Sequence, residues 1–184
     1  MLEVKGVTKR YGDLVAVDNL SFKVGTGEIF GLLGLNGAGK TTTFRMILNL
    51  FSPDDGEILF DDALVGYNLT DKIGFLSEER SLLVKMTVAE QLKYYGSLKN
   101  LSLGEVDSAT DYWLERFKIK DYKYKKIKEL SKGNQQKIQF ISAIMHNPRL
   151  LILDEPFNGL DPINVELFKD VILEFKNKGV TIIF

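Results

Sequence analysis

A glycine-rich segment in the first quarter of the chain has the residue types and spacing of a phosphate-binding loop. It fits the pattern G-x-x-x-x-G-K-[ST], with a strand pattern before it and a helical pattern after it. Glycines let the backbone curl so that successive N–H groups point at phosphate oxygens, and the helix N-terminus adds its positive dipole end. Lys40 would place its ammonium against the β- and γ-phosphates, and the Thr41 hydroxyl would bind Mg²⁺. A glycine-rich turn with no ligand is the alternative, which the flanking pattern disfavours. The candidate nucleotide-binding residues here are Gly34, Leu35, Asn36, Gly37, Ala38, Gly39, Lys40, Thr41 and Thr42.

Two adjacent acids follow a short apolar run later in the chain. Asp154 and Glu155 end the segment Leu150–Leu153, so they should emerge at the carboxyl edge of a buried strand, where open α/β sheets bind ligands. Asp154 would reach a Mg²⁺ ion, and Glu155 is the candidate catalytic residue, polarising a water for in-line attack on a γ-phosphate. An acidic turn closed by Pro156 is the alternative for the pair taken alone. The separate phosphate-loop pattern favours the catalytic interpretation.

The composition excludes several classes of function. The chain has 184 residues, 24 Lys plus Arg against 25 Asp plus Glu, no cysteine and a single histidine. This balance argues against nucleic acid as a partner, since affinity for phosphate backbones needs an excess of basic residues. Disulfide scaffolds, thiol chemistry and multi-histidine metal sites are excluded as well. No apolar run approaches the length of a membrane span, and no signal-peptide pattern opens the chain, which predicts a soluble, cytoplasmic protein.

Strand and helix patterns alternate at both ends of the chain, and helical patterns fill the middle third. We expect an edge strand over 2–8, and capping boxes at Thr87–Glu90 and Ser102–Glu105 ahead of two helices. Alternating elements favour a parallel α/β sheet with a helical insertion. The further expected strands cover residues 19–24, 28–34, 57–60, 73–76, 150–153 and 180–184. The further expected helices cover residues 41–50, 134–146 and 163–178.

Two more segments resemble motifs of a known family. Leu130-Ser131-Lys132-Gly133-Asn134 resembles the LSGGQ signature of ATP-binding cassette (ABC) ATPases, and the segment 158–161 resembles their D-loop. Together with the phosphate loop and the paired acids, these motifs follow the family's order along almost the whole chain. The sequence therefore resembles the nucleotide-binding subunits of ABC transporters, and most of all those of bacterial sodium or drug exporters.

The resemblance implies a fold and a domain plan. The fold class would be α/β, with a P-loop NTPase (RecA-like) parallel-sheet core, an N-terminal antiparallel β portion and an inserted α-helical subdomain. Residues 1–184 would form a single ABC ATPase domain. Residues 1–78 and 137–184 would hold the core and the β portion, and residues 79–136 the helical subdomain with the signature. The family's switch histidine would follow Phe184, so we expect a C-terminally truncated chain that binds nucleotide but hydrolyses it slowly.

The resemblance also implies ligands and partners. ATP and Mg²⁺ would be bound between two subunits in a head-to-tail homodimer or heterodimer, with Ser131, Gly133 and Asn134 contributed in trans. Ser131 would offer a hydroxyl and the Gly133 amide an N–H group at a helix N-terminus. The alternative for Ser131 is a plain N-cap of its own helix. A transmembrane permease subunit would hold the protein at the cytoplasmic face of the cell membrane. No nucleic-acid partner is expected.

Individual positions follow from the same comparison. Tyr11 would stack on adenine, Val17 would back the base, and Asp161 would be the D-loop acid. Glu78 stands where the family usually has a glutamine. A carboxylate is a hard oxygen donor, so Glu78 joins Thr41 and Asp154 as a predicted metal ligand. Lys132 and Asn134 replace a glycine and the glutamine of the signature.

Three functions remain to be separated. The first is an ATP hydrolase that drives a permease, with export as the expected direction. The second is a relative that acts on DNA or ribosomes. Such DNA-acting relatives carry long coiled coils, and the chain has no sustained heptads. The third is a small-molecule kinase, which would explain Lys40 and Asp154 but leaves the signature and D-loop segments unexplained.

Overall fold

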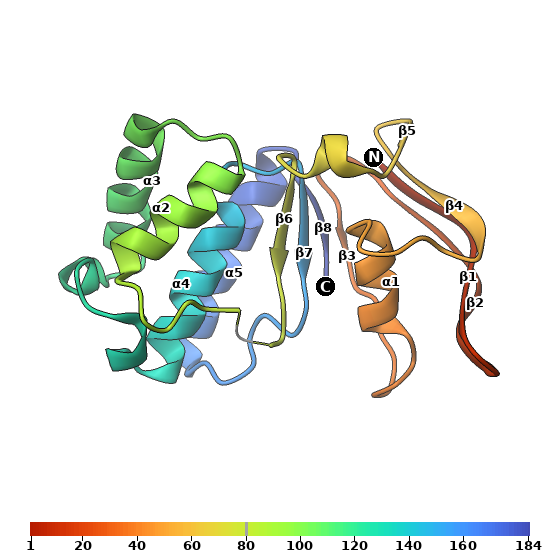
Figure 1. The fold of residues 1–184 in the computed structure, drawn as a ribbon, viewed down its shortest axis with the longest axis horizontal. Helices are drawn as coiled ribbons and strands as arrows, with labels where there is room; N and C mark the ends of the chain where they lie inside the picture. The colour runs from red at the N-terminus through yellow and green to blue at the C-terminus, as the bar shows by residue number, and fades with distance from the viewer. Residues whose placement is uncertain (80) are drawn as a thin grey trace.

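The computed structural model describes residues 1–79 and 81–184, which form two sheets and five α-helices (Figure 1). The N-terminal sheet is antiparallel, with strand order β2-β1-β4-β5. The prediction that residues 2–8 form an edge strand is wrong, because β1 lies between β2 and β4. Alternating apolar residues such as Leu2 and Val4 indicate that one face of a strand is buried. They do not indicate whether the strand lies at the edge or in the middle of its sheet. The strands are β1 (Leu2–Tyr11), β2 (Leu14–Val24), β4 (Asp55–Phe60) and β5 (Ala63–Leu64).

The second sheet is parallel throughout, with strand order β3-β8-β7-β6. Its strands are β3 (Ile29–Phe30), β6 (Ile73–Leu76), β7 (Leu150–Leu153) and β8 (Thr181–Ile183). All four carboxyl ends meet at one edge, so the segments that follow β3, β6 and β7 come together there. The strand expected over 28–34 is shorter than predicted, since the chain leaves the ladder after Phe30.

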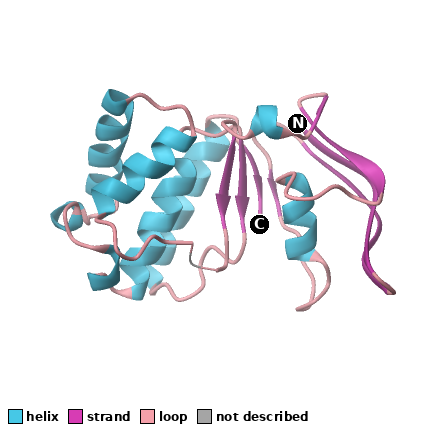
Figure 2. Cartoon of the chain, viewed as in Figure 1, coloured by secondary structure: helices cyan, strands magenta, loops and turns pink. Residues whose placement is uncertain are grey.

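The helices form separate layers around the parallel sheet (Figure 2). α1 (Lys40–Ile47) lies between the two sheets, and Phe44 packs in one cluster with β1 and with Leu150 and Ile152 of β7. The opposite face of β7, with Leu151 and Leu153, packs against the other helices. Both faces of β7 are therefore buried, which explains why this strand is continuously apolar. The other helices are α2 (Val88–Leu98), α3 (Leu103–Arg116), α4 (Lys132–Ile144) and α5 (Pro162–Asn177), with short 3₁₀ turns η1 (Tyr67–Leu69), η2 (Lys120–Tyr122) and η3 (Ile127–Glu129).

The predicted helical insertion is confirmed, and both predicted capping boxes are present. Thr87 caps α2 through Glu90, and Ser102 caps α3 through Glu105. α2, α3 and α4 share one hydrophobic cluster with the parallel sheet, so the expected subdomain limits at residues 79 and 136 stay a prediction. In the parts of the chain that the structure describes, no helix combines the length and apolar character needed to cross a membrane.

The chain's single histidine is buried behind the start of β6. His146 is 8% exposed, and its Nε2 lies 3.1 Å from the Ile73 carbonyl oxygen. Burial lowers the pKa of His146 from 6.5 to about 4, and the nearby Lys99 ammonium acts in the same direction. The ring is therefore neutral in the folded protein at neutral pH and serves the packing of β6.

Stability should fall as the pH drops from 6.5 to about 4, because the unfolded chain takes up a proton on His146 in this window and the folded chain does not. The histidine contributes about 3 kcal/mol to this loss. In His146→Gln, whose side chain does not titrate, the free energy of unfolding should depend less steeply on pH over the same window. Denaturant titrations at several pH values measure both slopes. Equal slopes would contradict the assignment of a neutral buried ring.

Candidate phosphate-binding site

The predicted phosphate-binding loop joins β3 to α1. Gly39 is the N-cap of α1, with φ of 85° and no capping side chain. A Cβ at this position would lie 2.3 Å from the carbonyl oxygen of Ala16 on β2. Only glycine allows both the left-handed backbone and the close approach of β2. The loop glycine therefore sets how closely the antiparallel sheet approaches the start of α1.

Gly39→Ala should destabilise the protein more than Gly12→Ala. Both glycines have positive φ, which costs a residue with a Cβ about 1–2 kcal/mol, but a Cβ at Gly12 meets no atom within 4 Å. The amount by which Gly39→Ala lowers the free energy of unfolding more than Gly12→Ala does measures the clash with Ala16. Urea unfolding of the two variants gives the comparison. Equal losses would contradict the close approach of β2 to the loop.

A cavity of about 390 Å³ opens above this loop, and side chains from three parts of the fold line it. The lining residues are Tyr11, Leu14, Ala16, Asn36, Gly37, Ala38, Gly39, Lys40, Thr41, Thr42, Glu78, Asp154 and Glu155. Residues far apart in the sequence thus meet at the carboxyl edge of the parallel sheet. Gly34 and Leu35 lie at the start of the loop, where their carbonyl oxygens accept hydrogen bonds from Lys40 Nζ at 2.6 and 3.2 Å.

The end of β1 brings an aromatic side chain to the cavity. Tyr11 is about half exposed, and its ring meets the Phe51 ring edge-on, with 6.2 Å between centroids. Val17 is buried and takes no part in the cavity lining. It packs instead toward the loop, and its Cγ2 would lie 3.0 Å from a Cβ at Gly39.

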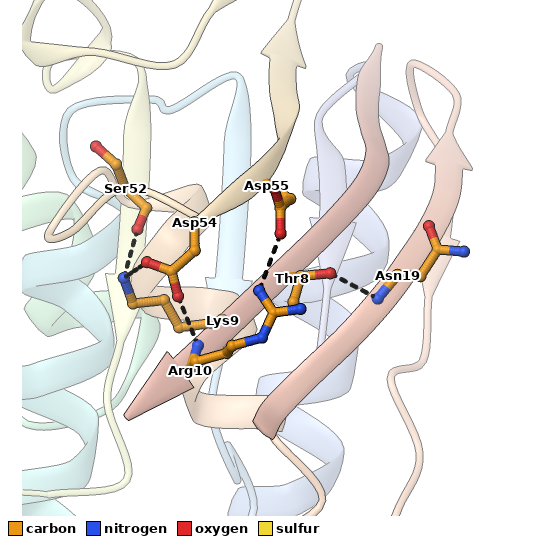
Figure 3. A network of polar contacts seen from close by, with 7 residues as sticks. All are labelled: Thr8, Lys9, Arg10, Asn19, Ser52, Asp54 and Asp55. Carbon is orange, nitrogen blue, oxygen red and sulfur yellow. Dashed lines mark hydrogen bonds and ion pairs between the residues drawn. The ribbon is translucent and has the colours of Figure 1, made fainter. Parts of the chain in front are cut away.

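A polar network holds the end of β1 in place (Figure 3). Lys9 Nζ donates to the Ser52 carbonyl at 2.9 Å and to Asp54 Oδ1 at 2.7 Å, and the Arg10 backbone N–H donates to Asp54 Oδ2. Lys9 is the main cause that lowers the pKa of Asp54 below its ordinary value. The Arg10 side chain pairs with Asp55. These contacts fix the strand end that carries Tyr11 against the segment before β4.

Sequence reasoning missed three apolar contributors to this part of the site. Leu14 and Ala16 line the cavity from β2, and Phe51 backs Tyr11 from the segment after α1. Tyr11 pairs with Leu14 across the turn at Gly12 and Asp13, so this tight turn was a signal for Leu14. Phe51 had no local signal, because its contact with Tyr11 comes from tertiary packing.

The three predicted metal ligands all line this cavity. The Thr41 hydroxyl donates to Asp154 Oδ2 at 3.3 Å, and Glu78 lines the same space from the end of β6. Asp154 is 5% exposed. Burial raises the pKa of Asp154, the negative charges of Glu78 and Glu155 raise it further, and the Thr41 hydrogen bond and Lys40 oppose this. A divalent cation at this place would offset the carboxylate repulsion.

These donors fit magnesium better than a transition metal. All are hard oxygens, and among residues 1–79 and 81–184 no group of three or more Asp, Glu or His is arranged to hold an ion. Mg²⁺ commonly takes only one or two carboxylates from a protein and completes its shell with phosphate oxygens and water. Thr41, Asp154 and Glu78 therefore suit a cation that arrives with a phosphate.

Glu155 lies beyond the end of β7 and has an unusual backbone conformation. β7 ends at Leu153, and Glu155 has φ of 51°, an uncommon conformation for a residue with a side chain. Asp154 stays buried while Glu155 is exposed toward the cavity. The two acids therefore have different environments although they are neighbours in the sequence, and the backbone at Glu155 is left-handed.

The signature and D-loop residues lie outside this cavity. Ser131 is the exposed N-cap of α4 and accepts a hydrogen bond from the Asn134 backbone N–H at 3.3 Å. Asp161 is the N-cap of α5, and the Asn164 backbone N–H is the main cause that lowers its pKa. The capping role considered for Ser131 is therefore present. Within one chain, neither Ser131, Gly133 and Asn134 nor Asp161 lines the cavity with Lys40.

Comparison with known proteins shows which family the chain belongs to. A family model described as ABC transporter matches residues 17–158. The chain belongs to the ABC transporter family of ATP-binding proteins. The matched span includes the predicted phosphate loop, the segment that resembles the signature, and the two acids after β7.

Individual relatives match along almost the whole of this chain, which spans only part of their own length. The uncharacterized ABC transporter ATP-binding protein YhaQ of Bacillus subtilis is 55% identical over all of this chain, which spans 62% of YhaQ. The Nod factor export ATP-binding protein I of Rhizobium leguminosarum bv. viciae is 36% identical over 99% of the chain and 60% of that relative. A solved structure of an ATP-binding subunit of an ABC transporter superposes with a TM-score of 0.91 at 30% identity, over 99% of this chain and 77% of that one. The predicted fold class is confirmed.

Proposed function

We propose that this chain binds ATP with Mg²⁺ and hydrolyses it as the ATP-binding subunit of an ABC transporter. The observation that carries the proposal is that three sets of residues line one and the same cavity. These are Tyr11, the loop ending in Lys40 and Thr41, and the acids after β6 and β7. Each of these groups suits a different part of a magnesium nucleotide. Tyr11 offers an aromatic face to the base, and the loop offers N–H groups and an ammonium to the phosphates.

Hydrolysis would break the bond between the γ-phosphorus and the β–γ bridging oxygen, as water adds to the γ-phosphorus. Lys40 and the N-terminus of α1 would stabilise the charge that develops on the leaving diphosphate. Glu155, exposed toward the cavity, would orient the water and accept its proton. Mg²⁺ held by Thr41, Asp154 and Glu78 would neutralise charge on the phosphate oxygens.

A second ATPase subunit would complete the site. Ser131 is exposed at the N-terminus of the thirteen-residue helix α4, where free backbone N–H groups and the helix dipole favour an anion. In a head-to-tail homodimer or heterodimer, Ser131, Gly133 and Asn134 would face the γ-phosphate on the partner's loop, and Asp161 would lie near the contact. Binding of ATP would close the dimer, and hydrolysis would release it.

The closing movement would drive a membrane permease, and the protein would sit at the cytoplasmic face of the cell membrane. One relative is named as an export protein, the Nod factor export ATP-binding protein I, and this name supports export as the direction of transport. Relatives that act on DNA or ribosomes remain the second class, and no feature of the described residues favours them.

The transport role is tested by co-expressing the tagged chain with the membrane protein encoded beside it. We expect the neighbouring reading frame to encode a protein with about six spanning segments. That protein should co-purify with the chain, and ATP hydrolysis should respond to the permease's substrate. Absence of any such neighbour, or a chain that stays apart from it in detergent extracts, would argue for a role outside transport.

A further inference from the structure

A buried glutamine on α4 holds the loop that carries Glu78. The Gln139 side chain is 4% exposed, and its Nε2 donates to the Ser77 carbonyl oxygen at 2.9 Å, to Ser77 Oγ at 3.1 Å and to the Glu79 carbonyl oxygen at 3.1 Å. Ser77 Oγ donates to the same Glu79 carbonyl at 2.6 Å. One amide group thus contacts the residues on both sides of Glu78.

Burying the Gln139 amide costs free energy, so the hydrogen bonds that it makes to the loop must offset that cost. Two of the three acceptors are carbonyl oxygens, so only the NH₂ end of Gln139 can face the loop. Its Oε1 is buried and has no hydrogen-bond partner among the described residues. An unpaired buried acceptor is unfavourable, and an apolar side chain would fill the same space without that penalty. The glutamine is therefore best explained by what its Nε2 holds.

α4 is a suitable platform for such a clamp. Ile138, Phe140 and Ile141 beside Gln139 are completely buried in the cluster that packs on the parallel sheet. Glu78, in contrast, is exposed on a loop at the cavity. A ligand on a loop binds metal well only if the loop's backbone is fixed by a rigid neighbour.

We propose that Gln139 is a positioning residue, which fixes the backbone on either side of Glu78 so that its carboxylate is presented to the metal at Thr41 and Asp154. This inference rests on the proposed function, in which Glu78 supplies a metal oxygen. It assigns to α4 a second role besides presenting Ser131, namely shaping the metal site of its own subunit.

The test measures Mn²⁺ binding to the full chain in the presence of ADP, by electron paramagnetic resonance of the free ion. Gln139→Met keeps the volume of the side chain and removes its donors. It should weaken Mn²⁺ binding about 10-fold, as losses around metal ligands commonly do, and leave metal-free ADP binding unchanged. Ser142→Ala is the matched control, because it removes a hydrogen bond to Ile138 on the same helix and none to the loop residues that the structure describes; it should bind Mn²⁺ as the wild type does.

A double variant separates positioning from general damage. If Gln139 acts through Glu78, then Gln139→Met should weaken Mn²⁺ binding no further in a Glu78→Gln background. Equal losses in both backgrounds, or unchanged affinity in Gln139→Met, would overturn the inference. A Glu78→Gln variant with wild-type affinity would overturn it too, while ADP binding would still support the proposed function. A wild type that binds no ADP would instead reject the proposed function itself.

Discussion

Replacement of Glu155 by glutamine should reduce ATP turnover roughly 100- to 10,000-fold, the range that a well-placed general base contributes. The substitution keeps the size of the side chain and its position at the cavity but removes the group that accepts a proton from water. Affinity for Mg-ATP should stay the same, because Lys40 and the loop N–H groups are untouched. Because ATP is bound but not cleaved, the variant should also accumulate as a closed dimer on size-exclusion chromatography. Phosphate release under saturating Mg-ATP measures the effect.

Glu166→Gln is the matched control for this result. Glu166 is an exposed acid on α5 that pairs with Lys169 and is not among the residues that line the cavity. ATP turnover by the Glu166→Gln variant should equal that of the wild type, since exposed ion pairs of this kind contribute little to stability. Undiminished turnover in the Glu155 variant would remove Glu155 from the proposed mechanism and leave the water to another group.

Among the proposed substitutions, Lys40→Ala should reduce the affinity for ATP the most. Truncating one member of a close charge pair costs about 2–5 kcal/mol, so Lys40→Ala should weaken ATP binding at least about 30-fold. In the structure, the Lys40 ammonium donates hydrogen bonds to the Gly34 and Leu35 carbonyl oxygens, which places its positive charge inside the loop proposed to bind the phosphates. Fluorescence titration with a labelled ATP analogue measures the affinity.

Lys93→Ala removes an exposed lysine from α2 and serves as the control for net charge. It should bind ATP as the wild type does, because its ammonium lies outside the cavity lining. If Lys40→Ala and Lys93→Ala bound ATP equally well, the loop would not be the phosphate site.

The local parts of the site were predictable from the sequence. The spacing of Gly34, Gly39 and Lys40 specifies a loop that needs few distant residues, and an apolar strand ending in Asp154 and Glu155 specifies where those acids emerge. Parallel strands then bring both to the same edge. Local signals also predicted α2 and α3, because each of their capping boxes is encoded within four residues.

Other features depend on contacts between distant segments. The central place of β1 depends on β4, which pairs with it after the whole of α1 has intervened. The left-handed backbone of Glu155 had no sequence signal, since non-glycine residues rarely adopt it. Gln139 looked like an ordinary helical residue, and only the structure places its amide against the loop of Glu78.

Titration calorimetry with Mg-ATP tests the central claim most directly. The purified chain should release heat that saturates at one nucleotide per chain, and the signal should be lost in Lys40→Ala while Glu155→Gln retains it. A folded wild-type chain that gives no binding heat, confirmed by absence of protection of the loop 34–42 in hydrogen exchange, would contradict the account.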